Sequence, residues 1–337
     1  MSFEHLAEIF LPSIEDELHM AVDLVDELNS DGLKHMLAYH LGWEGEGAGL
    51  EARGKRIRPL LVLFTAAAAG GEWERALPAA AAVELVHNFS LIHDDIEDNS
   101  PTRRGRSTVW KKWGVAQAIN AGDAMFTLAH LATLRLQDTA YSLIAFKATK
   151  ILQNVCLRLT QGQYMDLAYE ARGDLSMEAY WPMVSGKTAA LISACTELGA
   201  LVAETNDIIC ASYREFGYSL GLAFQAQDDL LGIWGDAAIT GKSAESDLLS
   251  GKKSLPVLFG LSQNGPFAAR WNQGPITPEE VPGLAVQLEH EGAYTATQAQ
   301  ATQLTDQSLG ALEQANPPGE AGEALRTLAL RLLKRQG

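Results

Sequence analysis

The sequence has 337 residues, of which 47% are apolar and 20% are charged, so the chain can bury a large core and is too apolar to be mostly disordered. Its 42 Asp and Glu against 26 Lys and Arg give a net charge of −16, which excludes nucleic acid as an expected partner. The three cysteines show no CxxC spacing and no disulfide framework, which favours a cytoplasmic protein. We expect no membrane span, because no apolar run approaches about 20 residues, and no signal peptide, because the acidic start lacks a basic flank.

Almost every long segment repeats its apolar residues at the period of an α-helix, beginning with an amphipathic stretch from Ile14 to Leu28. Alternating strand patterns are hard to find, and Ala and Leu predominate over β-branched residues. In chain order, the further predicted helices cover residues 58–69, 78–97, 116–136, 141–169, 186–203, 207–233 and 255–261, with several more after residue 282. The breaks, at residues 43–54, 70–72, 99–107, 235–253 and 264–283, are rich in Gly, Pro or polar residues. None looks like an interdomain linker, so we expect one all-helical domain over residues 1–337.

Acidic residues gather at the end of the helix predicted over residues 78–97. Asp94 and Asp98 are four residues apart, so they share a face, where like charges repel unless a cation lies between them. A run of acids is more often a solvated face, but the residues that precede this run are apolar nearly all round and predict a buried helix. Carboxylates on a buried helix need compensation, and oxygen ligands suit Mg²⁺, which takes substrate phosphates as further ligands.

A second acidic pair, Asp228 and Asp229, ends another apolar helical run. Basic residues stand in apolar or Gly-rich settings elsewhere, in residues 54–59, 103–104, 186–188, 242 and 251–253. Each cation alone is best interpreted as a solvated surface charge. Together with carboxylates that can hold metal, the cations predict a site for highly charged phosphate compounds, two of them.

The order and spacing of these motifs resemble the trans-type polyprenyl diphosphate synthases, the family of the farnesyl and geranylgeranyl diphosphate synthases. The similarity covers roughly residues 50–260. The motifs are Gly54-Lys55-Arg56-Ile57-Arg58-Pro59, His87, residues 94–98, Arg103-Arg104-Gly105, Gly186-Lys187-Thr188, Phe224-Gln225, Asp228-Asp229, Gly241-Lys242 and Gly251-Lys252. The resemblance implies a head-to-tail prenyltransferase with the all-α isoprenoid synthase (terpenoid synthase) type I bundle around a central cavity, usually a homodimer.

The resemblance also implies roles for individual residues. Asp94 and Asp98 match ligands of two Mg²⁺ ions and Asp228 matches the ligand of a third, while Asp95 orients water or a neighbouring side chain. The substrates are isopentenyl diphosphate and an allylic diphosphate such as the dimethylallyl, geranyl or farnesyl compound. The residues that match the binding site of the allylic diphosphate are Arg103, Lys187 and Lys252, with Lys242 nearby. Those that match the site of isopentenyl diphosphate are Lys55, Arg58, His87 and Arg104. Thr188 and Gln225 match the oxygen donors that stabilise the allylic cation, and Gln163 and Asp166 match a further motif of the family.

Ionisation of an allylic diphosphate concentrates negative charge on the leaving group, which Mg²⁺, Lys and Arg stabilise more strongly in the transition state than in the ground state. In the family, the double bond of isopentenyl diphosphate attacks the resulting cation, and the departing diphosphate removes the proton. The chemistry therefore requires no protein nucleophile.

Two residues on the predicted helix bear on the length of the product. Phe89 lies five residues before Asp94, about 7.5 Å along a helix at about 1.5 Å per residue, where it can form the floor of a product tunnel. Ser90 is small and leaves room. By resemblance, an aromatic residue at this position without an insertion between the aspartates indicates a geranylgeranyl (C20) product, with farnesyl (C15) as the alternative. The competing interpretation is that Phe89 only packs between helices.

The sequence departs from the family pattern at two places. Gly232 stands where many members have a third aspartate, so metal binding there would rest on Asp228, with Asp229 or Asp236 assisting. Arg53 replaces a glycine that is common before the Gly-Lys-Arg stretch, which leaves Lys55 and Arg58 in place.

Three other functions compete with a synthase. A terpene cyclase of the same fold would carry an Asn/Ser/Glu metal triad instead of Asp228-Asp229. A phosphohydrolase of the HD type, suggested by His93-Asp94, would need further histidine ligands, for which no motif is present. A regulatory subunit without activity would have lost an aspartate motif, and both motifs are intact.

Overall fold

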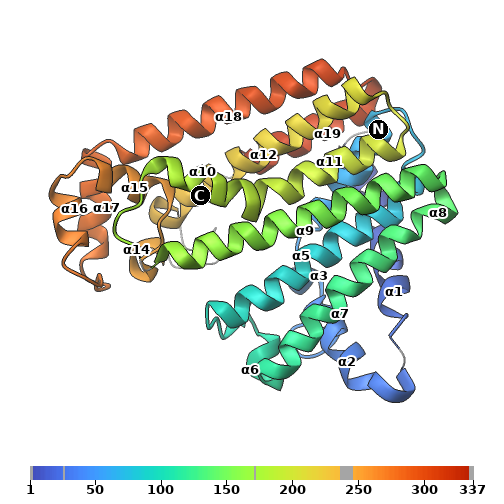
Figure 1. The fold of residues 1–337 in the computed structure, drawn as a ribbon, viewed down its shortest axis with the longest axis horizontal. Helices are drawn as coiled ribbons and strands as arrows, with labels where there is room; N and C mark the ends of the chain where they lie inside the picture. The colour runs from blue at the N-terminus through green and yellow to red at the C-terminus, as the bar shows by residue number, and fades with distance from the viewer. Residues whose placement is uncertain (1–2, 26, 171, 236–245, 334–337) are drawn as a thin grey trace. The chain divides into compact units, whose positions relative to one another are not determined.

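The computed structural model describes residues 3–25, 27–170, 172–235 and 246–333, which are helical apart from one two-stranded hairpin and the connecting loops (Figure 1). The all-α prediction is confirmed. The chain divides into two compact units, which are described separately below. The first comprises residues 1–154, 194–211 and 316–325, and the second comprises residues 155–193, 212–315 and 326–337. That all 337 residues form a single domain stays a prediction.

The first unit is built around a buried helix. In chain order its elements are α1 (Phe3–Val22), α2 (Glu27–His40), α3 (Leu50–Arg53), α4 (Ile57–Ala68), the 3₁₀ turn η1 (Trp73–Ala76), α5 (Leu77–Glu97), β1 (Thr102–Arg103), β2 (Arg106–Ser107), α6 (Val109–Trp113), α7 (Val115–Leu134) and α8 (Leu136–Thr139). Pro78 stands in the first turn of α5, where its missing N–H costs nothing. Residues 79–83 are small and fully buried, so α1, α4 and α7 approach α5 closely.

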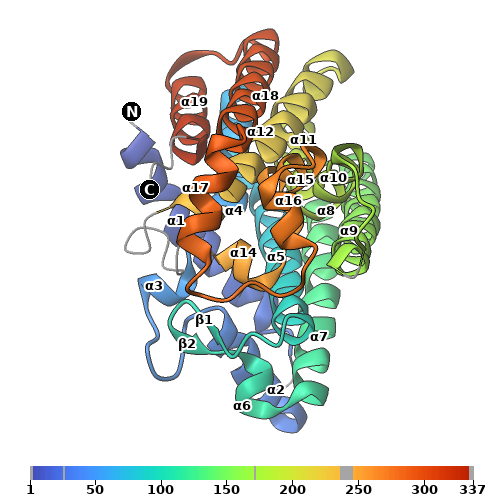
Figure 2. The same ribbon diagram turned by 90° about the vertical axis from the view of Figure 1, so that its left-hand side faces the viewer.

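Helices α5 and α7 run side by side along most of their lengths, as both views show (Figures 1 and 2). The antiparallel hairpin of β1 and β2 pairs Thr102 with Ser107 and Arg103 with Arg106. Because the hairpin follows the end of α5 after only four residues, it places two arginines close to the acidic motif of that helix.

The second unit contains the remaining helices. They are α9 (Ser142–Glu170), α10 (Met177–Val184), the π-helical segment η2 (Ser185–Ala189), α11 (Ala190–Val202), α12 (Asp207–Trp234), α14 (Ser246–Ser250), α15 (Leu255–Ser262), α16 (Pro266–Trp271), α17 (Val281–His290), α18 (Ala293–Ala315) and α19 (Gly319–Leu333). Helices α9, α11, α12 and α19 also carry residues of the first unit. Short helices gather around a small core that includes Leu248, Val257, Phe267 and Leu288 (Figure 2).

The structure corrects the first predicted helix. Helix α1 begins at Phe3 and ends at Val22, whereas the pattern predicted one helix from Ile14 to Leu28. Its buried stripe repeats every four residues at Phe10, Ile14, Leu18 and Val22, and Val22 is the last residue of the helix. Leu24 does not continue the stripe and is 56% exposed, so no apolar face supports a further turn.

Short elements also lie inside predicted breaks. The hairpin has two residues in each strand, which is too short for an alternating pattern to be recognised. Helix α16, of six residues, lies within the predicted break at residues 264–283. None of the described helices is long and apolar enough to cross a membrane.

Candidate active site

The first acidic motif occupies the last turn of α5. The Asp98 amide donates a hydrogen bond of 2.8 Å to the Asp94 carbonyl, so helical geometry reaches Asp98. Asp95 faces inward and is only 1% exposed, and its Oδ1 accepts a hydrogen bond from Nε of Arg103 and forms an ion pair with Nη2, both at 2.8 Å. Asp94 is half-buried and Asp98 exposed. Asp94 and Asp98 therefore lie on a different side of the turn from Asp95, which points inward and is bound by Arg103.

This donor set fits Mg²⁺. Across the described residues, no three His, Cys, Asp or Glu side chains form a group that could hold a metal ion by themselves. Asp94 and Asp98 are two carboxylates on an accessible turn, and Mg²⁺ is commonly bound by one or two carboxylates while water and substrate phosphates complete its coordination. The arrangement suits an ion that arrives with a phosphorylated ligand.

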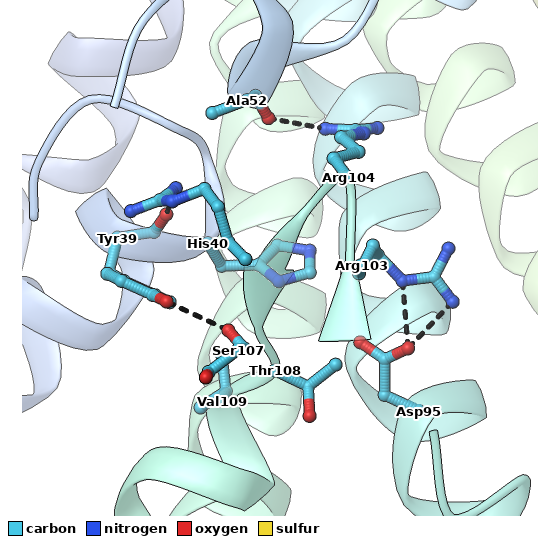
Figure 3. Close-up of a pocket in the computed structure, with 10 residues that line it drawn as sticks. Tyr39, His40, Ala52, Asp95, Arg103, Arg104, Ser107, Thr108 and Val109 are labelled. Atoms are coloured by element: carbon cyan, nitrogen blue, oxygen red, sulfur yellow. Dashed lines mark hydrogen bonds and ion pairs between the residues drawn. The ribbon is translucent and has the colours of Figure 1, made fainter. Parts of the chain in front are cut away.

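A basic pocket lies beside this motif, entirely within the first unit (Figure 3). Its charged lining comprises Arg103, Arg104, Arg106 and Asp95, with His40 from the end of α2. Arg104, in the hairpin turn, donates from Nη1 to the Ala52 carbonyl at 2.9 Å. The guanidinium groups of Arg103 and Arg104 give the pocket the character of an anion site, whereas that of Arg106 donates to the Tyr39, Glu44 and Glu46 carbonyls.

The Arg104 side chain also contacts Gly54, the first residue of the Gly54-Lys55-Arg56 loop. A Cβ at Gly54 would approach Cζ of Arg104 to 2.7 Å, and Gly54 has φ of +74°, so only glycine allows this contact without strain. Arg53, which stands where the family commonly has glycine, lies in α3 and not in this contact. The loop thus brings the predicted isopentenyl diphosphate residues to the arginines of the hairpin.

Two histidines belong to the same positive region. Burial lowers the pKa of His87 well below 6.5, and Arg58, Arg104 and Arg103 lower it further. Burial likewise lowers the pKa of His40, with the arginines of the pocket adding to the effect. Both imidazoles are neutral at pH 7 and can donate one hydrogen bond to an anion.

His40 was missed by sequence reasoning, which found no motif around it. Its Nε2 is buried without a hydrogen-bond partner. Helix α2 brings it to the hairpin, more than 60 residues away along the chain, and no local pattern predicts that contact. Of the predicted isopentenyl diphosphate residues, Arg58, His87 and Arg104 fall in this region, while Lys55 is exposed on the loop.

The neutral histidines predict how stability depends on pH. Because their folded-state pKa values lie below the ordinary 6.5, the unfolded chain binds more protons as pH falls below about 6.5, and stability is lost in that direction. Each imidazole contributes at most about 1.4 kcal/mol per pH unit. Urea unfolding at pH 7.5, 6.5 and 5.5 measures this slope. The double variant His40→Asn/His87→Asn should have a shallower slope, and an unchanged slope would contradict the assignment.

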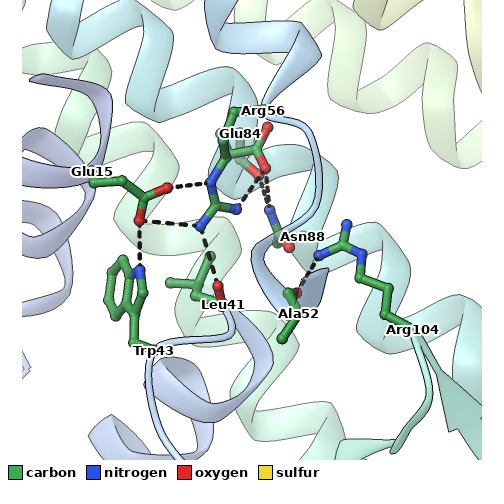
Figure 4. A network of polar contacts seen from close by, with 8 residues as sticks. All are labelled: Glu15, Leu41, Trp43, Ala52, Arg56, Glu84, Asn88 and Arg104. Atoms are coloured by element: carbon green, nitrogen blue, oxygen red, sulfur yellow. Dashed lines mark hydrogen bonds and ion pairs between the residues drawn. The ribbon is translucent and has the colours of Figure 1, made fainter. Parts of the chain in front are cut away.

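Arg56 has a different role from its neighbours Lys55 and Arg58. Its guanidinium is buried between Glu15 of α1 and Glu84 of α5, with Nε to Glu15 Oε1 at 2.7 Å and Nη1 to Glu84 Oε1 at 2.9 Å (Figure 4). Burial alone would lower the pKa of Arg56, but the two carboxylates raise it above its ordinary value. Arg56 also adopts φ of +47° at the start of α4. It therefore fixes the loop, whereas Lys55 and Arg58 remain accessible on either side.

A further group of the predicted site residues lies within the second unit. A cavity there is lined by Asp166 of α9, Tyr180 of α10, Lys187 and Thr188 of η2, Gln225 and Asp229 of α12, and Lys252 with its neighbours. A π-helical segment is uncommon and often occurs at functional sites. Here it carries the predicted Gly-Lys-Thr motif.

Polar contacts join the lining of this cavity. Thr188 Oγ1 donates to Gln225 Oε1 at 2.8 Å, and Gln225 Nε2 donates to Asp229 Oδ1 at 2.9 Å. Asp229 Oδ2 accepts from the Tyr180 hydroxyl and from the Leu255 amide, both at 2.8 Å. Burial raises the pKa of Asp229 to about 6. Asp229 is thus a buried anchor that orients Gln225, and Tyr180 is a contact that the sequence did not reveal.

The remaining acid and the cations surround this anchor. Asp228 is half-buried. Lys187 Nζ pairs with Asp166, and burial tends to lower the pKa of Lys252, but Asp247, Asp229 and Asp228 raise it above its ordinary value. Lys242 and Asp236, both named from the sequence, lie outside the described residues.

Comparison with known proteins identifies the family. Residues 48–273 match the polyprenyl synthetase family, and the chain belongs to it. The chain is 44% identical over 253 residues to a geranylgeranyl diphosphate synthase of Mycobacterium tuberculosis, covering 74% of this chain and 70% of that protein. It is 38% identical over 314 residues to a (2E,6E)-farnesyl diphosphate synthase of Mycobacterium bovis, covering 90% and 86%.

A solved structure supports the same assignment. The geranylgeranyl pyrophosphate synthase from Corynebacterium glutamicum, complexed with isoprenyl diphosphate and magnesium, matches with a TM-score of 0.85 at 28% identity over 100% of both chains. The resemblance seen in the motifs is confirmed, as is the isoprenoid synthase fold. The protein is a prenyltransferase enzyme of isoprenoid biosynthesis.

Proposed function

We propose that this enzyme condenses isopentenyl diphosphate with an allylic diphosphate, head to tail, to give a short-chain all-trans prenyl diphosphate. The observation that carries this proposal is the last turn of α5, where Asp94 and Asp98 face outward beside a pocket of three arginines. Named relatives that make geranylgeranyl and farnesyl diphosphate support it.

The metal is proposed to be Mg²⁺, three ions for each active site. Asp94 and Asp98 would hold two and Asp228 the third, with the neighbouring Asp229 withdrawn from direct binding by its hydrogen bonds to Tyr180, Gln225 and Leu255. Bound Mg²⁺ neutralises charge that develops on a leaving diphosphate. The magnesium in the related structure supports the choice of metal.

The protein's own groups bind and orient the substrates. Arg103 is held by Asp95, so its charge is fixed before an allylic diphosphate binds. Lys187 and Lys252 are proposed to contact the same diphosphate. The Thr188 hydroxyl donates its hydrogen bond to Gln225. The lone pairs of the hydroxyl oxygen therefore remain available to stabilise an allylic cation.

Isopentenyl diphosphate is proposed to bind Lys55, Arg58, Arg104 and the neutral His87. The double bond of this substrate attacks the allylic carbon as the bond from that carbon to the diphosphate oxygen breaks. The released diphosphate then accepts the proton lost from the isopentenyl unit, so the protein needs no nucleophile.

The product is proposed to be geranylgeranyl diphosphate, with farnesyl diphosphate as the alternative. Phe89 is half-buried, and its ring meets those of Phe126 on α7 and His93 in edge contacts, with centroids 5.1 Å and 5.7 Å apart. A ring fixed in this way can limit a product tunnel. Ser90, whose hydroxyl bonds the His87 carbonyl, occupies little space beside it.

Replacing Phe89 by alanine is expected to lengthen the main product from twenty carbons to twenty-five or more, with little loss of rate, because the ring no longer ends the tunnel. Chromatography of the dephosphorylated products measures this. Phe126→Ala is the control for loss of the aromatic contact alone. An unchanged product distribution in active Phe89→Ala would remove the support for a C20 product and favour C15.

The proposed function is tested by incubating the enzyme with Mg²⁺, isopentenyl diphosphate and, in turn, the dimethylallyl, geranyl and farnesyl diphosphates. A synthase converts at least one primer into a longer linear diphosphate. A terpene cyclase would release a hydrocarbon or alcohol without consuming isopentenyl diphosphate, and a regulatory subunit would form no product.

We also propose a homodimer in the cytoplasm. Large apolar side chains are exposed along α7 and the start of α9 within the first unit, at Ile119, Phe126, Leu134, Tyr141, Leu143 and Phe146. A second copy of this chain would cover them, and light scattering should then give twice the mass of one chain. No disulfide joins the three cysteines, all of which lie in the described residues, as is usual in the cytosol.

A further inference from the structure

A chain of hydrogen bonds runs from the core of the second unit to the wall of its cavity. The Tyr180 hydroxyl donates to Asp229 Oδ2 at 2.8 Å, and Gln225 Nε2 donates to Asp229 Oδ1 at 2.9 Å. Thr188 Oγ1 in turn donates to Gln225 Oε1 at 2.8 Å. All four residues line the cavity, but Tyr180 and Asp229 are each only 1% exposed, whereas Gln225 and Thr188 are partly exposed. Two buried groups therefore support two groups that a ligand can reach.

Asp229 determines the direction of the bonds in this chain. An ionised carboxylate only accepts hydrogen bonds, so the Gln225 amide must turn its nitrogen toward Asp229 and its oxygen toward Thr188. The Thr188 hydroxyl faces an amide oxygen and must donate its single proton to it. The Leu255 amide donates to the same Oδ2 atom as Tyr180, also at 2.8 Å, so Asp229 is held by both α10 and the start of α15.

We propose that Tyr180 is a positioning residue, which acts through Asp229 and Gln225 to fix the direction of the Thr188 hydroxyl. The Thr188 oxygen is then the atom that faces the allylic cation, and Gln225 orients this oxygen, because Gln225 Oε1 already accepts the Thr188 proton. The resemblance to the family gives Thr188 and Gln225 one shared role, whereas the hydrogen bonds give each its own. This inference rests on the proposed function.

Tyr180→Phe tests the role of the hydroxyl, because it keeps the buried ring. We expect kcat to fall by about 10-fold, since misplacing a group that acts on the reacting centre can cost as much as about 100-fold. The KM for isopentenyl diphosphate should not change, nor should the affinity for inorganic diphosphate with Mg²⁺, measured by calorimetry. The groups proposed to bind diphosphate lie outside the chain, whereas a general loss of structure would weaken binding as well.

A double-mutant cycle tests whether Tyr180 acts through Thr188. Thr188→Val removes the hydroxyl at the far end of the chain and keeps the shape of the side chain. In the Thr188→Val background, Tyr180→Phe should change kcat little, so the two losses should not add. Additive losses would overturn the proposal, as would a wild-type kcat in folded Tyr180→Phe.

Tyr218→Phe is the matched control. The Tyr218 hydroxyl lies in the same unit and donates to Ser185 Oγ at 3.0 Å, outside the chain. Its removal should leave kcat near the wild-type value in both the wild-type and the Thr188→Val backgrounds. A loss equal to that of Tyr180→Phe would show that any tyrosine hydroxyl of this unit supports activity, and would contradict a specific role for Tyr180.

Thermal unfolding gives a readout that does not depend on turnover. Tyr180→Phe and Gln225→Met each remove a donor to Asp229, so their effects on Tm should be coupled, and independent effects would contradict the chain. If the wild type makes prenyl diphosphates but the losses in kcat are additive, the inference alone fails. If the wild type forms no prenyl diphosphate, the proposed function fails and the role of Tyr180 in the reaction fails with it, while coupled effects on Tm would still establish the chain.

Discussion

Asp94→Ala and Asp228→Ala are each expected to lower turnover by about 10²-fold or more while the protein remains folded, because a single lost electrostatic contribution to a transition state has an effect of this size. Asp94 is half-buried on the outward side of the last turn of α5, and Asp228 is half-buried on α12, so neither truncation leaves a cavity in the core. Steady-state rates at saturating Mg²⁺, with circular dichroism of each variant, measure the effect.

The matched control is Glu97→Ala. Glu97 is an exposed acid of the same turn as Asp94, so its removal changes the net charge equally but takes away no proposed metal ligand. Its activity should stay within about threefold of the wild type, since surface substitutions usually have small effects. Activity near the wild-type level in folded Asp94→Ala or Asp228→Ala would show that the metal ligands have been assigned wrongly.

Glu84→Ala is expected to reduce the free energy of unfolding by about 3 kcal/mol, because it removes one of the two carboxylates that pair with the buried Arg56 guanidinium and leaves only Glu15. Arg56 and Glu84 are 3% and 2% exposed, so water cannot replace the lost carboxylate. Asn88 Nδ2, which donates to Glu84 Oε1 at 3.0 Å, would lose this bond and keep its bond to the Glu84 carbonyl. Urea unfolding at pH 7 measures the loss.

An exposed ion pair is the control for this effect. Glu313 pairs with Arg326 at 3.3 Å, and their side chains are 67% and 39% exposed, so Glu313→Ala should cost less than about 1 kcal/mol. If Glu84→Ala unfolds at the same urea concentration as Glu313→Ala, the Arg56 network does not stabilise the fold. Glu84→Gln, which keeps the hydrogen-bonding shape, should be intermediate.

Long periodic segments could be predicted from the sequence because local pattern and tertiary packing agree there. The helix predicted over residues 207–233 is α12, Asp207–Trp234, and the helix predicted over residues 141–169 is α9, Ser142–Glu170. The spacing of Asp94 and Asp98 likewise predicted one shared face, since helical geometry alone determines it.

Contacts between distant segments could not be predicted in the same way. The spacing does not reveal that Arg103 holds Asp95, or that Arg56 is buried against Glu84 while its neighbours remain accessible. His40 reaches the basic pocket only through the packing of α2. Such contacts depend on the tertiary fold, and a charged residue in a motif has the same local signature whether it binds a ligand or supports the loop.

A single time course that records diphosphate release and isopentenyl diphosphate consumption tests head-to-tail condensation most directly. The enzyme, Mg²⁺ and geranyl diphosphate are mixed with isotopically labelled isopentenyl diphosphate, and both quantities are followed in the same tube. Condensation predicts one diphosphate released for each isopentenyl unit incorporated, throughout the reaction and with no release when isopentenyl diphosphate is omitted. Diphosphate release that continues at the same rate without isopentenyl diphosphate would contradict it and indicate cyclisation or hydrolysis of the allylic substrate.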